Sequence, residues 1–322
     1  MKALVHGAIV ALNVGLALAV LATSAPGRYA DAHVERTVLS APHPALPWAP
    51  PVWHPGELSV LADLDRDPIP AARPPKVRSP SALVVDLDRG EVLWARDPDS
   101  PRTIASVTKL FSALALVSTS PDLESRHCVT WEQWPSRPGA RSKFETGHCY
   151  SGWDFVGAAL VSSDNRGAFA LPAVAGEDYY AFVERMNDVA ADLGATSASF
   201  VDPAGLEDEN VATVRDVLKA IVAVSAHPDL SIAASANGWT VEDEGSALAL
   251  RRSRQLITTN RLDGRYDTLA AKTGYTDTAH YCFATVVRTD RGRTLAAAVL
   301  GAPTNSARFA DVRALVDWAD EL

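Results

Sequence analysis

Residues 268–300, TLAAKTGYTDTAHYCFATVVRTDRGRTLAAAVL, contain three apolar runs that are separated by polar turn residues. The runs are Thr268–Ala271, Tyr281–Arg288 and Thr294–Leu300, and Asp290-Arg291-Gly292 is a turn signal between the last two. Short apolar runs with boundaries of this kind are typical of strands in a buried sheet. The stretch therefore predicts antiparallel strands near the C-terminus of the chain.

A second strand signal lies nearer the N-terminus, where Ser81–Leu87 and Glu91–Ala95 flank Asp88-Arg89-Gly90 and predict a β-hairpin. Between the two strand regions, apolar residues recur with helical spacing. The predicted helices cover Ser106–Val117, Gly152–Ser162, Asp178–Leu193, Val214–Ala226 and, after the last strand, Ala307–Trp318. This order predicts an α+β fold, in which an antiparallel sheet from both chain ends is covered by helices.

The composition narrows the class of protein. The 322 residues are 47% hydrophobic and 21% charged, a globular mix that excludes disordered, collagen-like and coiled-coil proteins. With 30 basic and 39 acidic residues the net charge is −9, so no general attraction to nucleic acid or to an anionic membrane surface is expected. Three cysteines match no zinc-site spacing, and we expect no metal and no organic cofactor.

The N-terminus carries an export signal. Lys2 precedes an apolar run that extends to about Ala22, and small residues allow cleavage after Ala22 or after Ala32. The run of about 20 residues is also just long enough to span a bilayer, so a retained membrane anchor is the alternative. We expect residues 1–32 to be a signal peptide or anchor. The protein would then be exported to the periplasm or cell envelope, and tethered to the inner membrane if the segment is retained.

Residues 33–80 are rich in proline, which lacks the N–H that helices and central strands require. This segment is expected to be an extended, semi-rigid linker, either a tether or a plain spacer. Trp48, Trp53 and Leu58–Leu61 could pack on a neighbouring surface. Residues 81–322 are predicted to form one catalytic domain.

Three short motifs carry chemistry. In Ser106-Val107-Thr108-Lys109 the serine and the lysine share one face of a helix start, so the hydroxyl and the amine can meet. Ser163-Asp164-Asn165 stands where a helix gives way to a polar break. Lys272-Thr273-Gly274 lies on an apolar strand, where glycine lets a ligand backbone approach closely and lysine adds a positive charge.

Each motif has an ordinary structural interpretation when taken alone. Lys109 could be a surface helix lysine, Ser163 a helix cap and Lys272 a solvated charge at a strand end. The three motifs occur, however, in one order and on the expected types of element. That combination is typical of penicillin-binding proteins and class A β-lactamases.

From about Ser81 to Trp318 the chain resembles the D-alanyl-D-alanine carboxypeptidase family of low-molecular-mass penicillin-binding serine peptidases. The resemblance implies a fold of the β-lactamase and DD-peptidase type. A class A β-lactamase would need a deacylating glutamate in a Glu-x-x-Leu-Asn pattern, which Glu207-Asp208-Glu209-Asn210 lacks, so we interpret these residues as loop acidity. The segments that carry the resemblance are Ser81–Asp86, Ile104–Leu110, Phe200–Leu206, Thr259–Leu262 and Lys272–Thr276.

The side chains indicate a serine mechanism without a Ser-His-Asp set. Ser106 is the predicted nucleophile, and Lys109 is the nearest base for its proton. Lys109 must be neutral to act, and burial together with the charge of Lys272 would lower its pKa. Ser163 can relay a proton to the leaving amine.

The remaining predicted site residues bind substrate. Asn165 would hold Lys109 and the substrate amide, while Lys272 and Thr273, with Gly274 beside them, suit the carboxylate of a leaving D-alanine. The resemblance implies an oxyanion hole made by the backbone N–H groups of Ser106 and Tyr275. It also implies peptidoglycan stem peptides as substrates and β-lactams as covalent inhibitors.

Two alternatives to a D-Ala-D-Ala carboxypeptidase remain open. The same residues could serve a DD-endopeptidase that cuts cross-links, or the chain could be a catalytically weak envelope module that binds peptidoglycan or β-lactams. Arg166-Gly167 replaces the usual acidic residue and alanine, and Ala279-His280 replaces a usual glycine. We expect these departures to affect substrate preference and rate rather than the fold.

Two of the three cysteines are predicted to form a disulfide, and the third is predicted to be a free, buried residue. Cys128 and Cys149 close a loop of about 21 residues in an exported protein, which favours a disulfide over two reduced thiols. Cys282 lies on an apolar strand and is expected to be a buried small hydrophobe. Because the resemblance ends at the final helix, any membrane attachment is expected to use the N-terminus.

Overall fold

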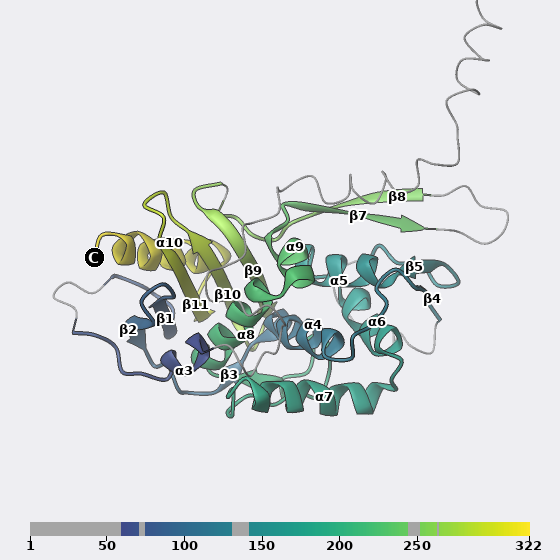
Figure 1. The fold of residues 1–322 in the computed structure, drawn as a ribbon, viewed down its shortest axis with the longest axis horizontal. Coiled ribbons are helices and arrows are strands. Elements are labelled where there is room, and N and C mark those ends of the chain that lie inside the picture. Colours follow the sequence, from purple (N-terminus) through teal and green to yellow (C-terminus); the bar gives the residue numbers. More distant parts are fainter. Residues whose placement is uncertain (1–58, 71–74, 131–141, 244–251, 263) are drawn as a thin grey trace, which may run out of the picture. The chain divides into compact units, whose positions relative to one another are not determined.

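The strands from the two ends of the chain pair in one antiparallel sheet, as the sequence predicted (Figure 1). Its five strands lie in the order β2-β1-β11-β10-β9. Gly90, with φ of 65°, makes the turn of the first hairpin. The strands are β1 (Ser81–Asp86), β2 (Glu91–Arg96), β9 (Asp267–Thr276), β10 (His280–Arg288) and β11 (Thr294–Ala302).

The computed structural model describes residues 59–70, 75–130, 142–243, 252–262 and 264–322. The predicted signal peptide or anchor (1–32) and most of the predicted linker lie outside these described residues, so both remain predictions. The predicted α+β architecture is confirmed within the described part.

Helices lie on both faces of the sheet, and the alternation of side chains along the strands explains why. On β1, Leu83 and Val85 point into one apolar core shared with the helices from the middle of the chain. Ala82 and Val84 point to the opposite face, into a second core with the C-terminal helix. Both faces of the sheet are therefore covered by helices and shielded from water, which is why β1 is buried along its whole length.

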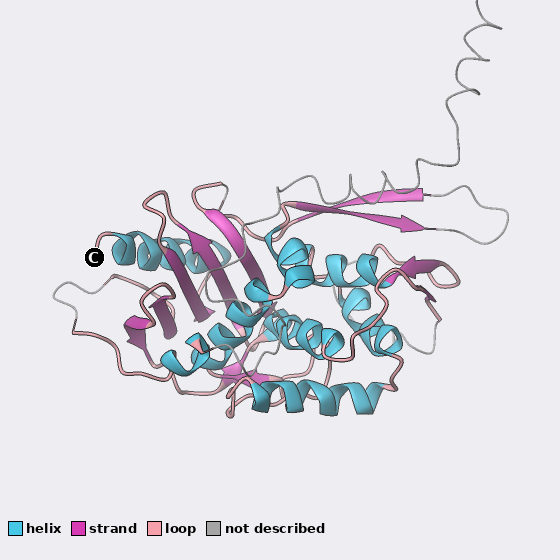
Figure 2. Cartoon of the chain, in the orientation of Figure 1, coloured by secondary structure: helices cyan, strands magenta, loops and turns pink. Residues whose placement is uncertain are grey.

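Most predicted helices are present within a residue or two of their expected ends. Figure 2 shows the helices from the middle of the chain gathered on one side of the sheet, with the C-terminal helix apart from them. The sequence did not predict α6 and α9, because Gly167 and Pro172 interrupt the pattern of α6 and α9 is only eight residues long. The helices are α3 (Val60–Asp63), η3 (Ala105–Thr108, a 3-10 turn), α4 (Lys109–Val117), α5 (Gly152–Val161), α6 (Asn165–Ala175), α7 (Tyr179–Asp192), α8 (Val214–Ala226), α9 (Pro228–Ser235) and α10 (Asn305–Asp320).

Three small two-stranded sheets complete the described fold. In one of them Cys128 lies directly opposite Cys149, and the two form the predicted disulfide. Cys282 is fully buried on β10, as expected for a small hydrophobe. The pairs are β3 (Arg102–Thr103) with β6 (Val211–Ala212), β4 (Arg126–Cys128) with β5 (Cys149–Ser151), and β7 (Gly238–Asp243) with β8 (Arg252–Ile257).

The part of the predicted linker that the structure describes packs against the domain. Val60, Leu61 and Leu64 of the α3 region are buried in the main core. Lys219 of α8 forms an ion pair with Asp65 at 2.8 Å. The packed part of the domain therefore begins before Ser81.

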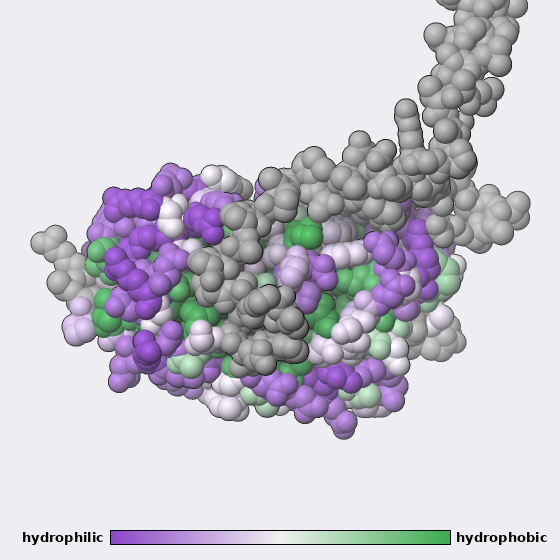
Figure 3. All heavy atoms as spheres, in the orientation of Figure 1, coloured by the Kyte–Doolittle hydropathy of each residue, from purple (hydrophilic) through white to green (hydrophobic). Residues whose placement is uncertain are grey.

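The surface view in Figure 3 shows mostly hydrophilic side chains on the described part of this face, with small apolar patches between them. Within the described ranges, no single helix is both long and apolar enough to cross a bilayer. Only α8 and α9 taken together meet those criteria, and they are bent by 106° at their junction.

Candidate active site

Ser106 and Lys109 lie on one continuous turn where η3 passes into α4. The Nζ of Lys109 is 2.8 Å from the Oγ of Ser106. Lys109 is fully buried because every residue of α4 faces other elements. The spacing of the first motif thus gives the expected contact between the predicted nucleophile and the predicted base.

Lys109 has two further partners, and both can only accept hydrogen bonds. Its Nζ is 2.9 Å from Oδ1 of Asn165 and 2.7 Å from the carbonyl oxygen of Ala204. A neutral amine has two N–H groups and one lone pair. If the N–H groups donate to Asn165 and Ala204, the lone pair faces Ser106 and must accept the serine proton. The geometry therefore suits a general base.

Burial lowers the pKa of Lys109 to about 7, because the buried site disfavours a charged amine. The carboxylates of Asp202 and Asp164 oppose this effect and raise the pKa. The expected help from Lys272 is not among the causes; instead the charge of Lys109 lowers the pKa of Lys272. A substantial neutral fraction of Lys109 is thus present near neutral pH.

Ser163 forms the junction between two helices. It follows the end of α5 and adopts φ of 61°, a left-handed conformation that costs a non-glycine residue about 1–2 kcal/mol. Asp164 then caps α6 by accepting the N–H of Gly167 at 3.1 Å. This sharp junction directs the Oγ of Ser163 to Lys272, whose Nζ donates to it at 2.9 Å.

Lys272 and Thr273 reach the site from β9, an edge strand of the main sheet. Lys272 is 1% exposed, and burial, followed by the charges of Lys109 and Arg308, holds its pKa well below the ordinary value. The hydroxyl of Thr273 donates to the hydroxyl of Thr259 at 2.7 Å. The strand thus presents an amine and a hydroxyl side by side.

Gly274 is explained by the protein's own backbone. A Cβ at this position would lie 2.6 Å from the carbonyl oxygen of Ile104 and 3.1 Å from the backbone nitrogen of Val107. The sequence expectation was that glycine makes room for a ligand backbone, whereas the structure shows that it lets β9 approach η3. The close approach joins the strand motif to the serine motif.

Asp202 organises the loop that supplies the Ala204 carbonyl. Its buried carboxylate accepts the backbone N–H groups of four consecutive residues, 204–207, at 2.7–3.0 Å. The side chain of Asn210 donates to it as well, at 3.0 Å. The loop is therefore held rigidly at Lys109, a role for the Phe200–Leu206 segment that sequence reasoning did not predict.

The predicted site residues meet at one cavity of about 820 Å³. Lys109 and Lys272 lie beneath its wall and reach it through their hydrogen bonds to Ser106 and Ser163. The predicted residues that line it are Ser106, Ser163, Asn165, Thr273, Gly274 and Tyr275. All eight predicted catalytic and substrate-binding residues are thus brought together.

Arg308 also lines this cavity, although it was not predicted. Its Nη1 donates to the carbonyl oxygens of Gly274 and Cys282, at 2.9 and 3.2 Å, while its buried Nε has no partner in the described part of the chain. Burial lowers the pKa of Arg308 to about 10. The sequence held a sign that Arg308 has a special role, because an arginine is unusual among the apolar residues of the first turns of a buried helix face.

The two departures from the family pattern lie outside the cavity lining. Arg166 is exposed and donates to the carbonyl of Phe144 at 2.8 Å. Gly167 is required locally, because a Cβ there would lie 2.9 Å from the carbonyl oxygen of Phe155. His280, with φ of 53°, turns the chain from β9 into β10. Asn210, the last residue of the Glu207-Asp208-Glu209-Asn210 stretch, donates a hydrogen bond to the carboxylate of Asp202 and so helps to hold that loop.

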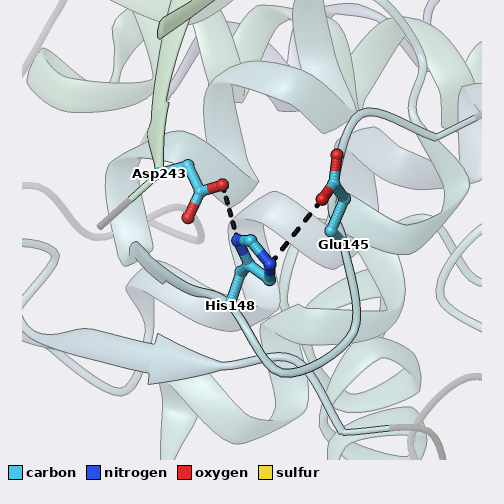
Figure 4. Close-up of side chains that lie close together, drawn as sticks. All are labelled: Glu145, His148 and Asp243. Carbon is cyan, nitrogen blue, oxygen red and sulfur yellow. Dashed lines mark hydrogen bonds and ion pairs between the residues drawn. The ribbon is translucent and has the colours of Figure 1, made fainter. Parts of the chain in front are cut away.

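A second cluster of titratable groups, Glu145, His148 and Asp243, has ligand-type atoms within 4.8 Å of one another (Figure 4). The Nδ1 of His148 lies 2.6 Å from Asp243, and its Nε2 lies 3.6 Å from Glu145. Glu145 also pairs with Arg254. Histidine and carboxylate side chains in such a group can hold a metal ion. In the structure, their contacts join the turn before β5 to the two-stranded sheet of β7 and β8.

The chain is similar to several known proteins. The D-alanyl-D-alanine carboxypeptidase family, Peptidase_S11, matches residues 69–304. The D-alanyl-D-alanine endopeptidase of Pseudomonas aeruginosa is 32% identical over 269 residues, which are 82% of this chain and 85% of the relative. That of Escherichia coli is 30% identical over 252 residues, 77% and 79% of the two chains.

Among solved structures, a D-alanyl-D-alanine carboxypeptidase from Mycobacterium tuberculosis is 25% identical, with a TM-score of 0.70. The match covers 80% of this chain and 97% of that one. The family match, the relatives and the shared fold lead to one conclusion: the chain belongs to the D-alanyl-D-alanine carboxypeptidase family and is a serine-type peptidase.

Proposed function

We propose that the protein cleaves the bond after a D-alanine of peptidoglycan stem peptides, through an acyl-enzyme on Ser106. The observation that carries this proposal is the set of contacts around Lys109. The oxygens of Asn165 and Ala204 take up the two N–H groups of the neutral amine, so its lone pair can accept a proton only from the hydroxyl of Ser106. That hydroxyl lies 2.8 Å from the amine, at the wall of a cavity of about 820 Å³.

In acylation, neutral Lys109 takes the proton of Ser106 while Oγ attacks the carbonyl carbon of the D-alanine. The negative charge that develops on the carbonyl oxygen would be stabilised by the backbone N–H groups of Ser106 and Tyr275. Donors in such positions contribute about 3–4 kcal/mol each to the transition state.

The amide C–N bond then breaks, and the leaving amine needs a proton. The proton that Lys109 took from Ser106 can reach the amine through the hydroxyl of Ser163, which lines the cavity and accepts a hydrogen bond from Lys272. Water subsequently attacks the ester carbonyl, frees the serine and leaves the shortened peptide with a D-alanine carboxylate. The reaction consumes one water and needs no other reactant.

The leaving group's own carboxylate fits the cationic end of the cavity. Thr273 offers a hydroxyl there, and Arg308 offers an unpartnered buried Nε. Burial lowers the pKa of Lys272, and the negative charge of a bound carboxylate would act in the opposite direction and favour the protonated amine. This is the ligand chemistry expected for a peptide whose reacting residue ends in a carboxylate.

Carboxypeptidase activity, which releases the terminal D-alanine, is the first candidate. Endopeptidase activity on cross-links is the second, and it is favoured by the names of the Pseudomonas and Escherichia relatives. We also propose export to the cell envelope, consistent with the apolar N-terminal run in the sequence. Mass spectrometry of the mature N-terminus would distinguish cleavage of residues 1–32 from retention as an anchor.

The test uses purified protein and a fluorescent penicillin. We expect a covalent adduct on the wild type, no adduct on Ser106→Ala, and cleavage of pentapeptide or of cross-linked muropeptides by the wild type alone. An adduct that survives Ser106→Ala would contradict the nucleophile. An adduct without cleavage of either substrate would favour a binding module instead.

A further inference from the structure

A second cavity, of about 440 Å³, adjoins the active-site cavity. The two share Arg261 and Asn305 in their walls. The rest of the second cavity is formed by the first turns of α10, through Thr304, Ser306, Phe309 and Arg313. It therefore continues the active site from the end where Arg308 and Thr273 lie.

The second cavity is cationic. Neither Arg261 nor Arg313 forms an ion pair with any residue in the described part of the chain. Arg261 lies close enough to Arg308 for its charge to act on that guanidinium. The partly positive N-terminus of α10, a helix of 16 residues, adds to the same field.

Two buried polar atoms at the boundary have no hydrogen-bond partner among the residues that the structure describes. These are the Nε of Arg308, whose residue is 7% exposed, and the Oδ1 of Asn305. Buried polar atoms are normally hydrogen-bonded, so these two atoms are available to a ligand that enters the cavities. One is a cationic donor and the other an acceptor, which suits a peptide that carries both a carboxylate and N–H groups.

We propose that this second cavity binds the leaving peptide of a cross-link, with a carboxylate of that second stem peptide held between Arg261 and Arg313. The inference rests on the proposed function and specifies its substrate. A single D-alanine ends at its own carboxylate and would leave the second cavity empty. A cross-linked leaving group continues past that point.

Arg313 follows Phe309 by four residues, so the two share one face of α10, and both line the second cavity together with Arg261. The bond cleaved is the amide between the D-alanine carbonyl and the second peptide's amine, with water supplying the hydroxyl and the proton.

The test compares kcat/KM of the full chain on a cross-linked muropeptide dimer and on a linear pentapeptide. For Arg313→Glu we expect the ratio of the two values, dimer over pentapeptide, to fall about tenfold. The matched control is Arg288→Glu, the same change of charge at the far end of β10, and it should leave the ratio unchanged. Thermal melting of each variant shows whether it folds.

The outcomes separate the two claims. A wild type that cleaves the pentapeptide but not the dimer, or an Arg313→Glu variant that loses both activities equally or neither, overturns the second-peptide site while the proposed function stands. Failure of the wild type to react with penicillin and with both peptides overturns the proposed function as well.

Discussion

At the scale of single residues, the central feature is Lys109, a lysine whose surroundings suit the proposed role of a base. Burial lowers its pKa, while the nearby carboxylates of Asp202 and Asp164 limit the fall to about 7. Sequence spacing predicted the contact of Lys109 with Ser106, because residues three apart share a helix face. It could not predict the Ala204 carbonyl, which lies 95 residues away in the chain.

Asp202→Asn is expected to lower kcat/KM about 10- to 100-fold. An amide cannot accept all four backbone N–H groups that the carboxylate now holds, and hydrogen bonds to a charged group contribute about 1.5–3 kcal/mol. Removal of this negative charge also lowers the pKa of Lys109, so the pH profile should move to lower pH. Steady-state kinetics across pH would measure both effects.

Glu209→Gln is the control for this variant, because Glu209 lies in the same loop and is exposed. It removes one negative charge without touching the carboxylate's hydrogen bonds. A wild-type rate and pH profile for Asp202→Asn would show that Asp202 does not position the Lys109 partner.

At the scale of elements, the site depends on how closely β9 approaches η3. Each motif was recognisable locally: the serine motif at a helix start, the second motif between helices and the third on a strand. Their meeting was a tertiary property, which depends on glycine at 274 and on the left-handed junction at Ser163. The helices α6 and α9 were not predicted, because Gly167 and Pro172 interrupt the pattern of α6 and α9 has only eight residues.

Gly274→Ala is expected to reduce the rate of penicillin acylation at least 100-fold. The added methyl would overlap the backbone at Ile104, and neither backbone can move without separating β9 from η3. Overpacking of this kind costs about 1–3 kcal/mol of stability, so the variant should still fold. Stopped-flow acylation and thermal melting would be measured together, and acylation at the wild-type rate would contradict the close-approach argument.

At the scale of the whole molecule, the sheet was predictable because its strands are short apolar runs bounded by turn residues. Two features were not. The α3 segment packs into the core although it lies in a proline-rich stretch, and Arg308 reaches the cavity from a helix that the sequence assigned only to packing. Both depend on contacts between distant segments, which local patterns do not contain.

The central claim is that Ser106 is activated by a neutral Lys109. Its most direct test is the pH dependence of the second-order rate constant for acylation by a penicillin. Neutral lysine increases as pH rises through the pKa, so the rate should rise with a midpoint near pH 7, and Lys109→Arg should abolish the reaction. A rate that is flat across pH 5 to 9, or one that Lys109→Arg leaves intact, would contradict the account.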